Sequence, residues 1–341
     1  MESKKQPKKD EVVSELRRDL VTGNWVVIAR ARGARLGAGM PRGKEIEDPI
    51  ETCPFEDPQA STNAEPILLY KNKKEGWSLQ VIPNKYPAFA GGECDTIRKV
   101  GPYSVQDGRG FHEVLITRDH SKHFALLSSE RVLEVFRAYK ERYLALRDEG
   151  CVRYISIFHN HGKGAGASLT HPHSQIIAIP ISPSDARRSF SGATTFYRKH
   201  NTCVHCAMLD WERKEKIRIV VQNKHFIAVC PFISRNASEV RIFPQKHHAH
   251  FEHIEDAKLP FLSEIFHDVL MRLYDKLDNP PYNFYLHTAP SDQEYPQYHW
   301  HFEIHPKTEI SAGFELGTGV EISTVEPERA AAILRGNYVI K

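Results

Sequence analysis

One pattern occurs twice along this chain of 341 residues, and it limits the possible fold more than any other feature. An apolar run at Val114–Thr117 leads to a His-x-x-His-Phe motif that begins at His120. A second apolar run, Val240–Phe243, leads to the same motif beginning at His247. Agreement in motif, order and spacing is typical of an internal duplication.

Each motif is followed by a helix-like stretch and then by a short strand. Apolar residues recur at helical spacing from after Ser128 as far as Gly150, and a second such stretch ends before Pro280. Further strand-like runs follow at residues 154–158 and 283–286. Apolar positions that recur every three or four residues predict a helix with one buried face, so each half should contain one long helix.

Each half then reaches a His-x-His motif, which begins at His171 in the first half and at His299 in the second. These motifs lie 51 residues after His120 and 52 residues after His247. We therefore predict an α+β protein made of two halves related by duplication, each an antiparallel sheet with a long helix.

The totals are those of a soluble globular protein. Apolar residues make up 40% and charged residues 26%, and the formal net charge of +3 leaves no strong field for a nucleic acid. We expect residues 1–14 to be a disordered basic tail, residues 15–195 to be the first half and residues 196–341 the second. No run of 18 apolar residues and no signal-peptide core occurs, so we expect a cytoplasmic protein without a membrane partner. In such a chain the six cysteines are not expected to form a disulfide framework.

A glycine-rich stretch, Asn160–Ser168, precedes the segment His171-Pro-His173-Ser-Gln175 and a further apolar run. Alternate residues of a strand point to the same face, so His171, His173 and Gln175 should project together. Glycines let backbone N–H groups approach phosphate oxygens, although the spacing fits neither a Walker loop nor a dinucleotide-binding fingerprint. A neutral imidazole attacks phosphorus without first losing a proton, which makes His173 the candidate nucleophile.

These residues resemble the galactose-1-phosphate uridylyltransferase family, the transferase branch of the histidine-triad superfamily. The resemblance extends from about Glu15 to Val325. It implies two histidine-triad-like halves, a covalent nucleotidyl group on His173 and a homodimer. Hydrolases of the superfamily carry a third histidine where Gln175 stands. A glutamine can hydrogen-bond a phosphate oxygen but cannot protonate a leaving group, so the resemblance implies transfer and not hydrolysis.

Further segments match the family's substrate-contacting positions. Arg32 and Arg35 correspond to arginines that approach the phosphates. Asn84 lies in a segment similar to the nucleotide pocket, where Lys85 replaces an aspartate found in many uridylyltransferases. The other matches are Asn160 and Ser168 at positions that contact sugar and phosphate, Gly166 in the glycine loop, and Glu315, whose counterpart binds hexose hydroxyls.

The second half contains a set of residues suited to zinc, namely Cys203-x-x-Cys206 with His247 and His299. Two thiolates and two imidazoles make a closed tetrahedral site, and soft thiolates suit zinc better than magnesium. A Cys-x-x-Cys pair also occurs in redox proteins, but no thioredoxin-like βαβ pattern surrounds this one. We therefore predict a structural zinc site here.

By the repeat, the first half should place Cys53, residue 56, His120 and His171 around a second metal. The family often has another cysteine three residues after the first, and here Glu56 takes that place. A carboxylate can ligate zinc, so we predict a site of Cys53, Glu56, His120 and His171 that is weaker than the other, or empty. Zinc on His171 would hold the strand that aims the nucleophile.

Two other histidines match iron or zinc ligands of some family members. These are His287 and His301, which we expect to lie around the second-half metal site. His301 also stands at the place equivalent to His173. It lacks the glycine loop and the following glutamine, so we expect no second nucleophile there.

Together these features predict a ping-pong enzyme that moves UMP between UDP-glucose and a hexose 1-phosphate such as galactose 1-phosphate. One alternative is an ADP-sugar phosphorylase or adenylyltransferase of the same family, which Lys85 and the Cys-x-x-Cys pair keep open. An alternative of a different class is a zinc-stabilised nucleic-acid-binding protein. The balanced charge and the lack of a basic stripe argue against that class.

Overall fold

The computed structural model describes residues 13–30, 32, 48–94, 96–290 and 294–337. Almost all of the predicted basic tail and the predicted phosphate contact Arg35 lie outside these residues.

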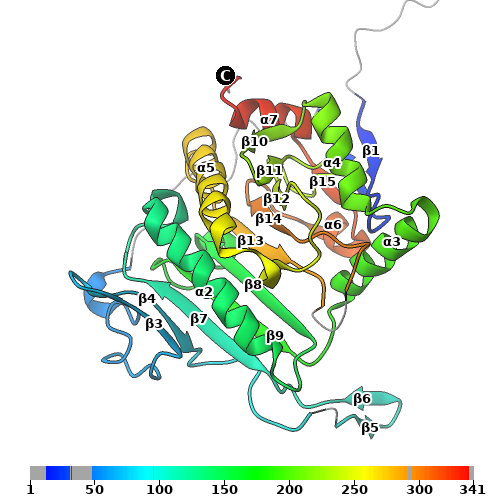
Figure 1. Ribbon diagram of the computed structural model, residues 1–341. Coiled ribbons are helices and arrows are strands. Elements are labelled where there is room, and N and C mark those ends of the chain that lie inside the picture. Colours follow the sequence, from blue (N-terminus) through cyan, green and yellow to red (C-terminus); the bar gives the residue numbers. More distant parts are fainter. Residues whose placement is uncertain (1–12, 31, 33–47, 95, 291–293, 338–341) are drawn as a thin grey trace, which may run out of the picture.

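The centre of the molecule is one ten-stranded antiparallel sheet (Figure 1). The first half supplies β3 (Leu68–Asn72), β4 (Gly76–Pro83), β7 (Phe111–Thr117), β8 (Tyr154–His161) and β9 (His173–Ile179). The second half supplies β10 (Ile219–Gln222), β11 (Phe226–Val229), β12 (Val240–Pro244), β13 (Tyr282–His287) and β14 (His301–Pro306).

The order of the strands confirms the duplication. Outward from the centre, the first half runs β8-β9-β7-β4-β3 and the second runs β13-β14-β12-β11-β10. The two halves meet where β8 pairs with β13, in a register that places Asn160 opposite Asn283. The expected pair of sheets is therefore a single continuous sheet, a feature that the sequence analysis did not predict.

Two long helices, α2 (Ser129–Arg147) and α5 (Leu259–Leu277), lie side by side on one face of this sheet (Figure 1). Both confirm the helices predicted from apolar spacing. The hydroxyl of Ser128 caps α2 by accepting the backbone N–H of Arg131 at 3.2 Å. The buried face of α2 packs on the sheet and on α5, where Phe136 meets Phe266 with ring centroids 5.1 Å apart.

The largest hydrophobic cluster of the described residues extends through both halves. Phe284 on β13 contacts Phe124 from the first half and Phe266 from the second, with ring centroids 5.2 and 4.9 Å apart. Truncation of a buried phenylalanine typically costs about 3–5 kcal/mol, so this shared cluster couples the stability of the two halves.

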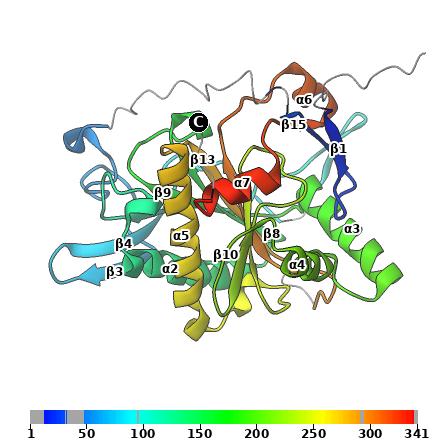
Figure 2. The same ribbon diagram turned by 90° about the horizontal axis from the view of Figure 1, so that it is seen from above.

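Smaller elements surround the sheet (Figure 2). They are β1 (Glu15–Arg18), β2 (Trp25–Ile28), β5 (Arg98–Val100), β6 (Tyr103–Val105), β15 (Glu321–Ser323), α3 (Ser184–His200), α4 (Val204–Glu215), α6 (Gly313–Thr318) and α7 (Pro327–Leu334). β2 pairs with β15 in parallel, so the start of the described chain lies against its end. The division near residue 195 remains our prediction. No helix of the described part is long and apolar enough to cross a membrane.

One pair of cysteines differs from expectation. Cys94 and Cys151 form a disulfide, with Cα atoms 5.6 Å apart. The bond joins the segment before β5 to the turn after α2. The two cysteines are 57 residues apart and share no motif, so the sequence alone carried no sign of this contact.

Candidate active site and metal-ligand clusters

The proposed nucleophile, His173, begins β9 and lies in the middle of the sheet. Its Nδ1 lies 2.9 Å from the carbonyl oxygen of His171, a group that can only accept a hydrogen bond. Nδ1 therefore carries the proton and Nε2 presents a lone pair. Burial lowers the pKa of His173, so the imidazole is neutral at physiological pH. Phe55 packs its ring against the imidazole with centroids 5.2 Å apart.

Gln175 follows on the same face of β9, as predicted. Its Oε1 lies 2.8 Å from Nε2 of His112 on β7. His112 is a residue that the sequence analysis missed, because a single histidine in a strand matches no motif. The predicted nucleotide contact Asn84 also reaches this histidine, with its Nδ2 3.1 Å from the same Nε2.

The glycine-rich loop connects β8 to β9. Gly162 and Gly166 have φ angles of 79° and 86°, which side chains rarely tolerate, so glycine is needed at both positions. The backbone N–H groups of Ala165, Gly166 and Ala167 donate to carbonyls within the loop. These three amides are already bonded, so the expectation that the loop's N–H groups approach a phosphate does not extend to them.

A residue of the second half supports this loop. Asn283 on β13 donates its Nδ2 to the Oδ1 of Asn160 and to the carbonyl of Ala165, both at 2.8 Å. The predicted sugar and phosphate contact Ser168 is exposed further along the same loop. No local sequence pattern marks Asn283, because it reaches the loop through the pairing of β8 with β13.

Two predicted substrate contacts lie elsewhere. Glu315 is in α6, where its carboxylate accepts the backbone N–H of Ala312 at 3.0 Å. Figures 1 and 2 show α6 beside β15 and away from β9. Arg32 is exposed. Hydrogen bonds from backbone N–H groups lower the pKa of the Glu315 carboxyl, and the positive charge of Arg32 adds a smaller contribution. The roles of Arg32 and Glu315 remain predictions.

The four predicted zinc ligands of the second half are brought together. The ligand atoms of Cys203, Cys206, His247 and His299 all lie within 4.8 Å of one another. Cys206 Sγ is 3.3 Å from Nδ1 of His247 and 3.6 Å from Nδ1 of His299. In a tetrahedral zinc site a sulfur and a nitrogen ligand stand about 3.6 Å apart, so this cluster fits zinc.

The first half contains a smaller cluster of Cys53, His120 and His171, again within 4.8 Å. Cys53 Sγ lies 3.4 Å from Nδ1 of His171, whose Nε2 donates to the carbonyl of Thr117 at 2.8 Å. A backbone carbonyl on the second ring nitrogen is the usual arrangement for a metal-ligating histidine. Three donors with this arrangement fit zinc.

Glu56 lies at the edge of this cluster and outside the group of three. One carboxylate oxygen pairs with Arg118. The other, Oε2, is buried without a hydrogen-bond partner and lies 3.4 Å from Nδ1 of His120. Oε2 is therefore the atom that Glu56 can offer to the site while its other oxygen stays paired with Arg118.

The second half repeats the geometry of the nucleophile. His301 Nδ1 lies 3.0 Å from the carbonyl of His299, as His173 does from that of His171. The residue two positions later, however, is Glu303. Its Oε1 lies 3.5 Å from Nε2 of His301. A carboxylate at that nitrogen repels a phosphate group, which agrees with the expectation of no second nucleophile.

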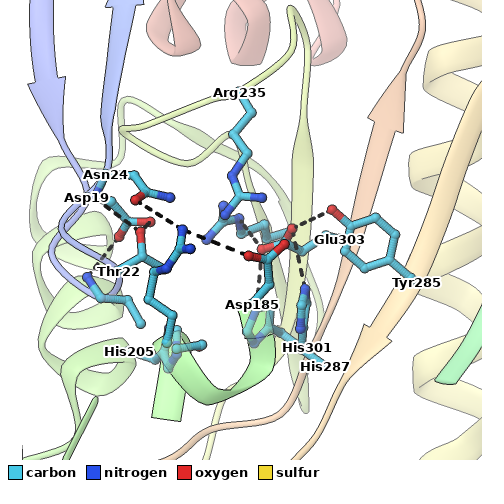
Figure 3. Close-up of a pocket in the computed structure, with 14 residues that line it drawn as sticks. Asp19, Thr22, Asn24, Asp185, His205, Arg235, Tyr285, His287, His301 and Glu303 are labelled. Carbon is cyan, nitrogen blue, oxygen red and sulfur yellow. Dashed lines mark hydrogen bonds and ion pairs between the residues drawn. The ribbon is translucent and has the colours of Figure 1, made fainter. Parts of the chain in front are cut away.

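Figure 3 shows the cavity around Glu303, which has a volume of about 140 Å³. Tyr285 donates its hydroxyl to Glu303 Oε2 at 3.0 Å, and Arg241 Nε lies 3.0 Å from Oε1. Ligand atoms of His287, His301 and Glu303 come within 4.8 Å of one another. This is a further group able to hold a metal, although Arg241 competes for the carboxylate.

The duplicated sheet, with a His-x-His pair in each half and a glutamine after the first pair, has a histidine-triad-like fold. A family model described as galactose-1-phosphate uridyl transferase, N-terminal domain, matches residues 4–183, and a domain of unknown function matches residues 109–335. The chain belongs to the galactose-1-phosphate uridylyltransferase family.

Two relatives cover nearly the whole chain. An ADP-glucose phosphorylase of Arabidopsis thaliana is 31% identical over 94% of this chain and 92% of its own length. A galactose-1-phosphate uridylyltransferase of Thermotoga maritima is 29% identical over 95% of this chain and 99% of its own. The crystal structure of an Arabidopsis thaliana ADP-glucose phosphorylase with bound ADP-glucose has a TM-score of 0.79 and 30% identity, and covers 95% of this chain and 99% of that chain.

Proposed function

We propose that this enzyme transfers a nucleotidyl group from a nucleotide sugar to a phosphate-bearing acceptor through a covalent intermediate on His173. The observation that supports this most directly is the 2.9 Å contact between His173 Nδ1 and the carbonyl of His171. It fixes the tautomer in which Nε2 is free to attack. It also stabilises the positive charge that the ring gains when Nε2 forms a bond to phosphorus.

In the first step, the lone pair of His173 Nε2 attacks the α-phosphorus of the nucleotide sugar. The bond from that phosphorus to the bridging oxygen breaks, and its electron pair leaves with the sugar 1-phosphate. No proton has to move, because the leaving group is a phosphate oxygen of low basicity. Gln175 Nε2 donates to a non-bridging oxygen of the attacked phosphorus and stabilises its charge.

In the second step, a phosphate oxygen of the acceptor attacks the same phosphorus and breaks its bond to Nε2. The neutral imidazole is restored. Asn160, Ser168 and the part of the glycine loop whose N–H groups are not bonded within the loop contact the sugar and phosphate in this proposal. Transfer between two phosphate oxygens is close to reversible, which suits an exchange reaction.

Zinc has a structural role in the proposal. Cys203, Cys206, His247 and His299 hold one ion, and Cys53, His120 and His171 hold a second, weaker one with Glu56 beside it. Each ion would supply rigidity, since structural zinc stabilises the fold outright. The first-half ion would also fix the segment from which the carbonyl of His171 reaches His173.

For the substrates, we propose UDP-glucose as donor and a hexose 1-phosphate such as galactose 1-phosphate as acceptor, in a homodimer. The matching family model and the Thermotoga maritima relative support this pair. A second candidate is ADP-glucose with inorganic phosphate as acceptor. The similarity to an ADP-glucose phosphorylase with bound ADP-glucose supports it, as does Lys85, which stands where many uridylyltransferases have an aspartate.

Steady-state turnover separates these candidates. UDP-glucose and ADP-glucose are each supplied with galactose 1-phosphate or with phosphate, and the products are resolved by chromatography. We expect one pairing to exceed the others by at least about 100-fold and to be lost in His173→Asn. Equal activity in His173→Asn contradicts the proposed nucleophile. Salt-sensitive RNA binding without turnover would instead favour the nucleic-acid-binding alternative.

A further inference from the structure

A contact between two strands of the active half bears on how Gln175 is oriented. β7 and β9 are neighbours, and Gln175 is paired with Val114 in their register. His112 lies two residues before Val114, on the same face, at the diagonal position. Its imidazole bridges this diagonal, so that Nε2 lies 2.8 Å from Oε1 of Gln175.

The surroundings of His112 fix which nitrogen carries the proton. The backbone N–H of Ala88 points at Nδ1 of His112 over 3.1 Å, and a backbone N–H can only donate. Nδ1 is therefore the acceptor of the neutral ring, and Nε2–H is the donor. Asn84 Nδ2 is itself a donor, because its Oδ1 accepts the N–H of Tyr86, so it does not bond to Nε2–H, which donates to the carbonyl oxygen of Gln175.

We propose that His112 is a positioning residue, which holds the amide of Gln175 with its Nε2 toward the phosphoryl group. This inference rests on the proposed function. An amide can rotate by half a turn at small cost, and the rotated form would present an oxygen to the negatively charged phosphoryl oxygens. Because Oε1 of Gln175 accepts the hydrogen bond from His112, the two N–H groups of the amide face the substrate.

The same residue, through its ring and its backbone carbonyl, links the glutamine to the nucleotide-pocket segment. Besides its contact with Ala88, His112 accepts the backbone N–H of Asn84 on its own carbonyl at 2.8 Å. Asn84 in turn accepts the N–H of Tyr86 on its Oδ1 at 2.8 Å. His112 thus joins the turn at residues 84–88 to the strand of the nucleophile.

The second half serves as an internal comparison. There Glu303 stands in place of Gln175, and its register partner is Arg241. Glu239, two residues before Arg241, stands in place of His112 and binds Arg241 Nε at 2.8 Å. In the half without the predicted nucleophile, the carboxylates of Glu239 and Glu303 therefore both form ion pairs with Arg241. Of the two equivalent places in the sheet, the one beside His173 has the histidine–glutamine pair and the other does not.

The test measures formation of the nucleotidyl-histidine in a single turnover, in His112→Phe and His112→Gln. His112→Phe keeps the ring volume and removes the donor. We expect its rate to fall about tenfold, while the Kd for the nucleotide sugar changes less than about threefold. In His112→Gln an amide N–H replaces Nε2–H, and we expect the rate to return to within about threefold of the original.

A double-mutant cycle tests whether His112 acts through the glutamine. In a Gln175→Ala background, His112→Phe should have no further effect on the rate. The matched control is His305→Phe, because His305 Nδ1 makes the same kind of bond, to Asn236 Oδ1 at 2.9 Å, in the half without the predicted nucleophile. That variant should react at the original rate.

Three results would overturn the proposal: an unchanged rate in His112→Phe, an equal loss in the Gln175→Ala background, or a ¹⁵N spectrum that shows His112 protonated on Nδ1. The spectrum requires no variant and no activity, so a misfolded variant does not remove the test. A parent enzyme that forms no adduct with either nucleotide sugar would overturn the proposed function as well. Adduct formation with no effect of His112→Phe would overturn the positioning role alone.

Discussion

The carbonyl oxygen of His171 lies 2.9 Å from Nδ1 of His173, while Nδ1 of His171 faces the sulfur of Cys53 at 3.4 Å. One residue thus touches the proposed nucleophile with its backbone and the proposed metal cluster with its side chain. The metal would act on catalysis through this residue, by limiting the freedom of the segment that orients the imidazole.

Loss of the first-half metal should therefore slow the chemical step. In Cys53→Ser we expect nucleotidyl-histidine formation to be slower by about 10- to 100-fold, with little change in the Kd for the nucleotide sugar. Rapid-quench measurement of the adduct gives the rate. Cys206→Ser is the control, because it damages the other cluster. Cys206→Ser should lower the melting temperature and keep the rate of adduct formation within about threefold of the original. An equal loss of rate in both variants would contradict the link between the first-half metal and catalysis.

The two metal clusters should differ in affinity. We expect mass-spectrometric metal analysis to find zinc in both clusters. A mild chelator should remove it readily from the first-half cluster and slowly from the second-half cluster, because Glu56 of the first-half cluster also pairs with Arg118. Glu56→Cys should make the first cluster retain zinc as well as the second. No gain in retained zinc in this variant would speak against Cys53, His120 and His171 as ligands.

The loop support from Asn283 should matter more for activity than for stability. Removal of two hydrogen bonds in Asn283→Ala frees the loop that carries the substrate contacts, and we expect kcat/KM to fall about tenfold. Asn223→Ala is a matched control, because Asn223 Nδ2 donates to the carbonyl of Phe261 at 2.7 Å. Both variants should lose about 1–3 kcal/mol of unfolding free energy, because each removes at least two hydrogen bonds. Similar kcat/KM values in the two variants would show that Asn283 has no special role.

His123 should make the protein sensitive to acid. It is 7% exposed, and burial, with a smaller contribution from His161, lowers its pKa from 6.5 to about 3. The folded protein keeps this ring neutral while the unfolded chain binds a proton below pH 6.5, so stability is lost as pH falls from 6.5 toward 3. Between pH 6.5 and 5.0 this amounts to about 1.5 kcal/mol.

His123→Phe removes that titration. Urea unfolding of the parent and the variant at pH 6.5 and 5.0 gives the two pH dependences. The variant should lose about 1.5 kcal/mol less between these values. Equal losses would mean that His123 is not buried as a neutral ring.

The sequence predicted the parts of this protein that depend on local pattern. Apolar spacing located α2 and α5, and the repeat located both His-x-His motifs and both groups of candidate metal ligands, of which the first comes together without Glu56. It did not predict the pairing of β8 with β13, because any exposed strand edge offers the same backbone groups. Three further features were not predicted either, namely Asn283, His112 and the bond between Cys94 and Cys151. Each acts through a neighbour that is distant along the chain, and no local pattern records that neighbour.

The central claim is that His173 carries the nucleotidyl group, and the mass of the protein after brief incubation with a nucleotide sugar tests it most directly. The enzyme is mixed with UDP-glucose or ADP-glucose without acceptor, quenched and digested, and the peptide that contains His171-Pro-His173 is weighed. We predict that one donor adds a uridylyl or adenylyl group to His173, and that added acceptor removes it. Sugar-nucleotide turnover without any adduct on His173, or with full activity in His173→Asn, would contradict the account.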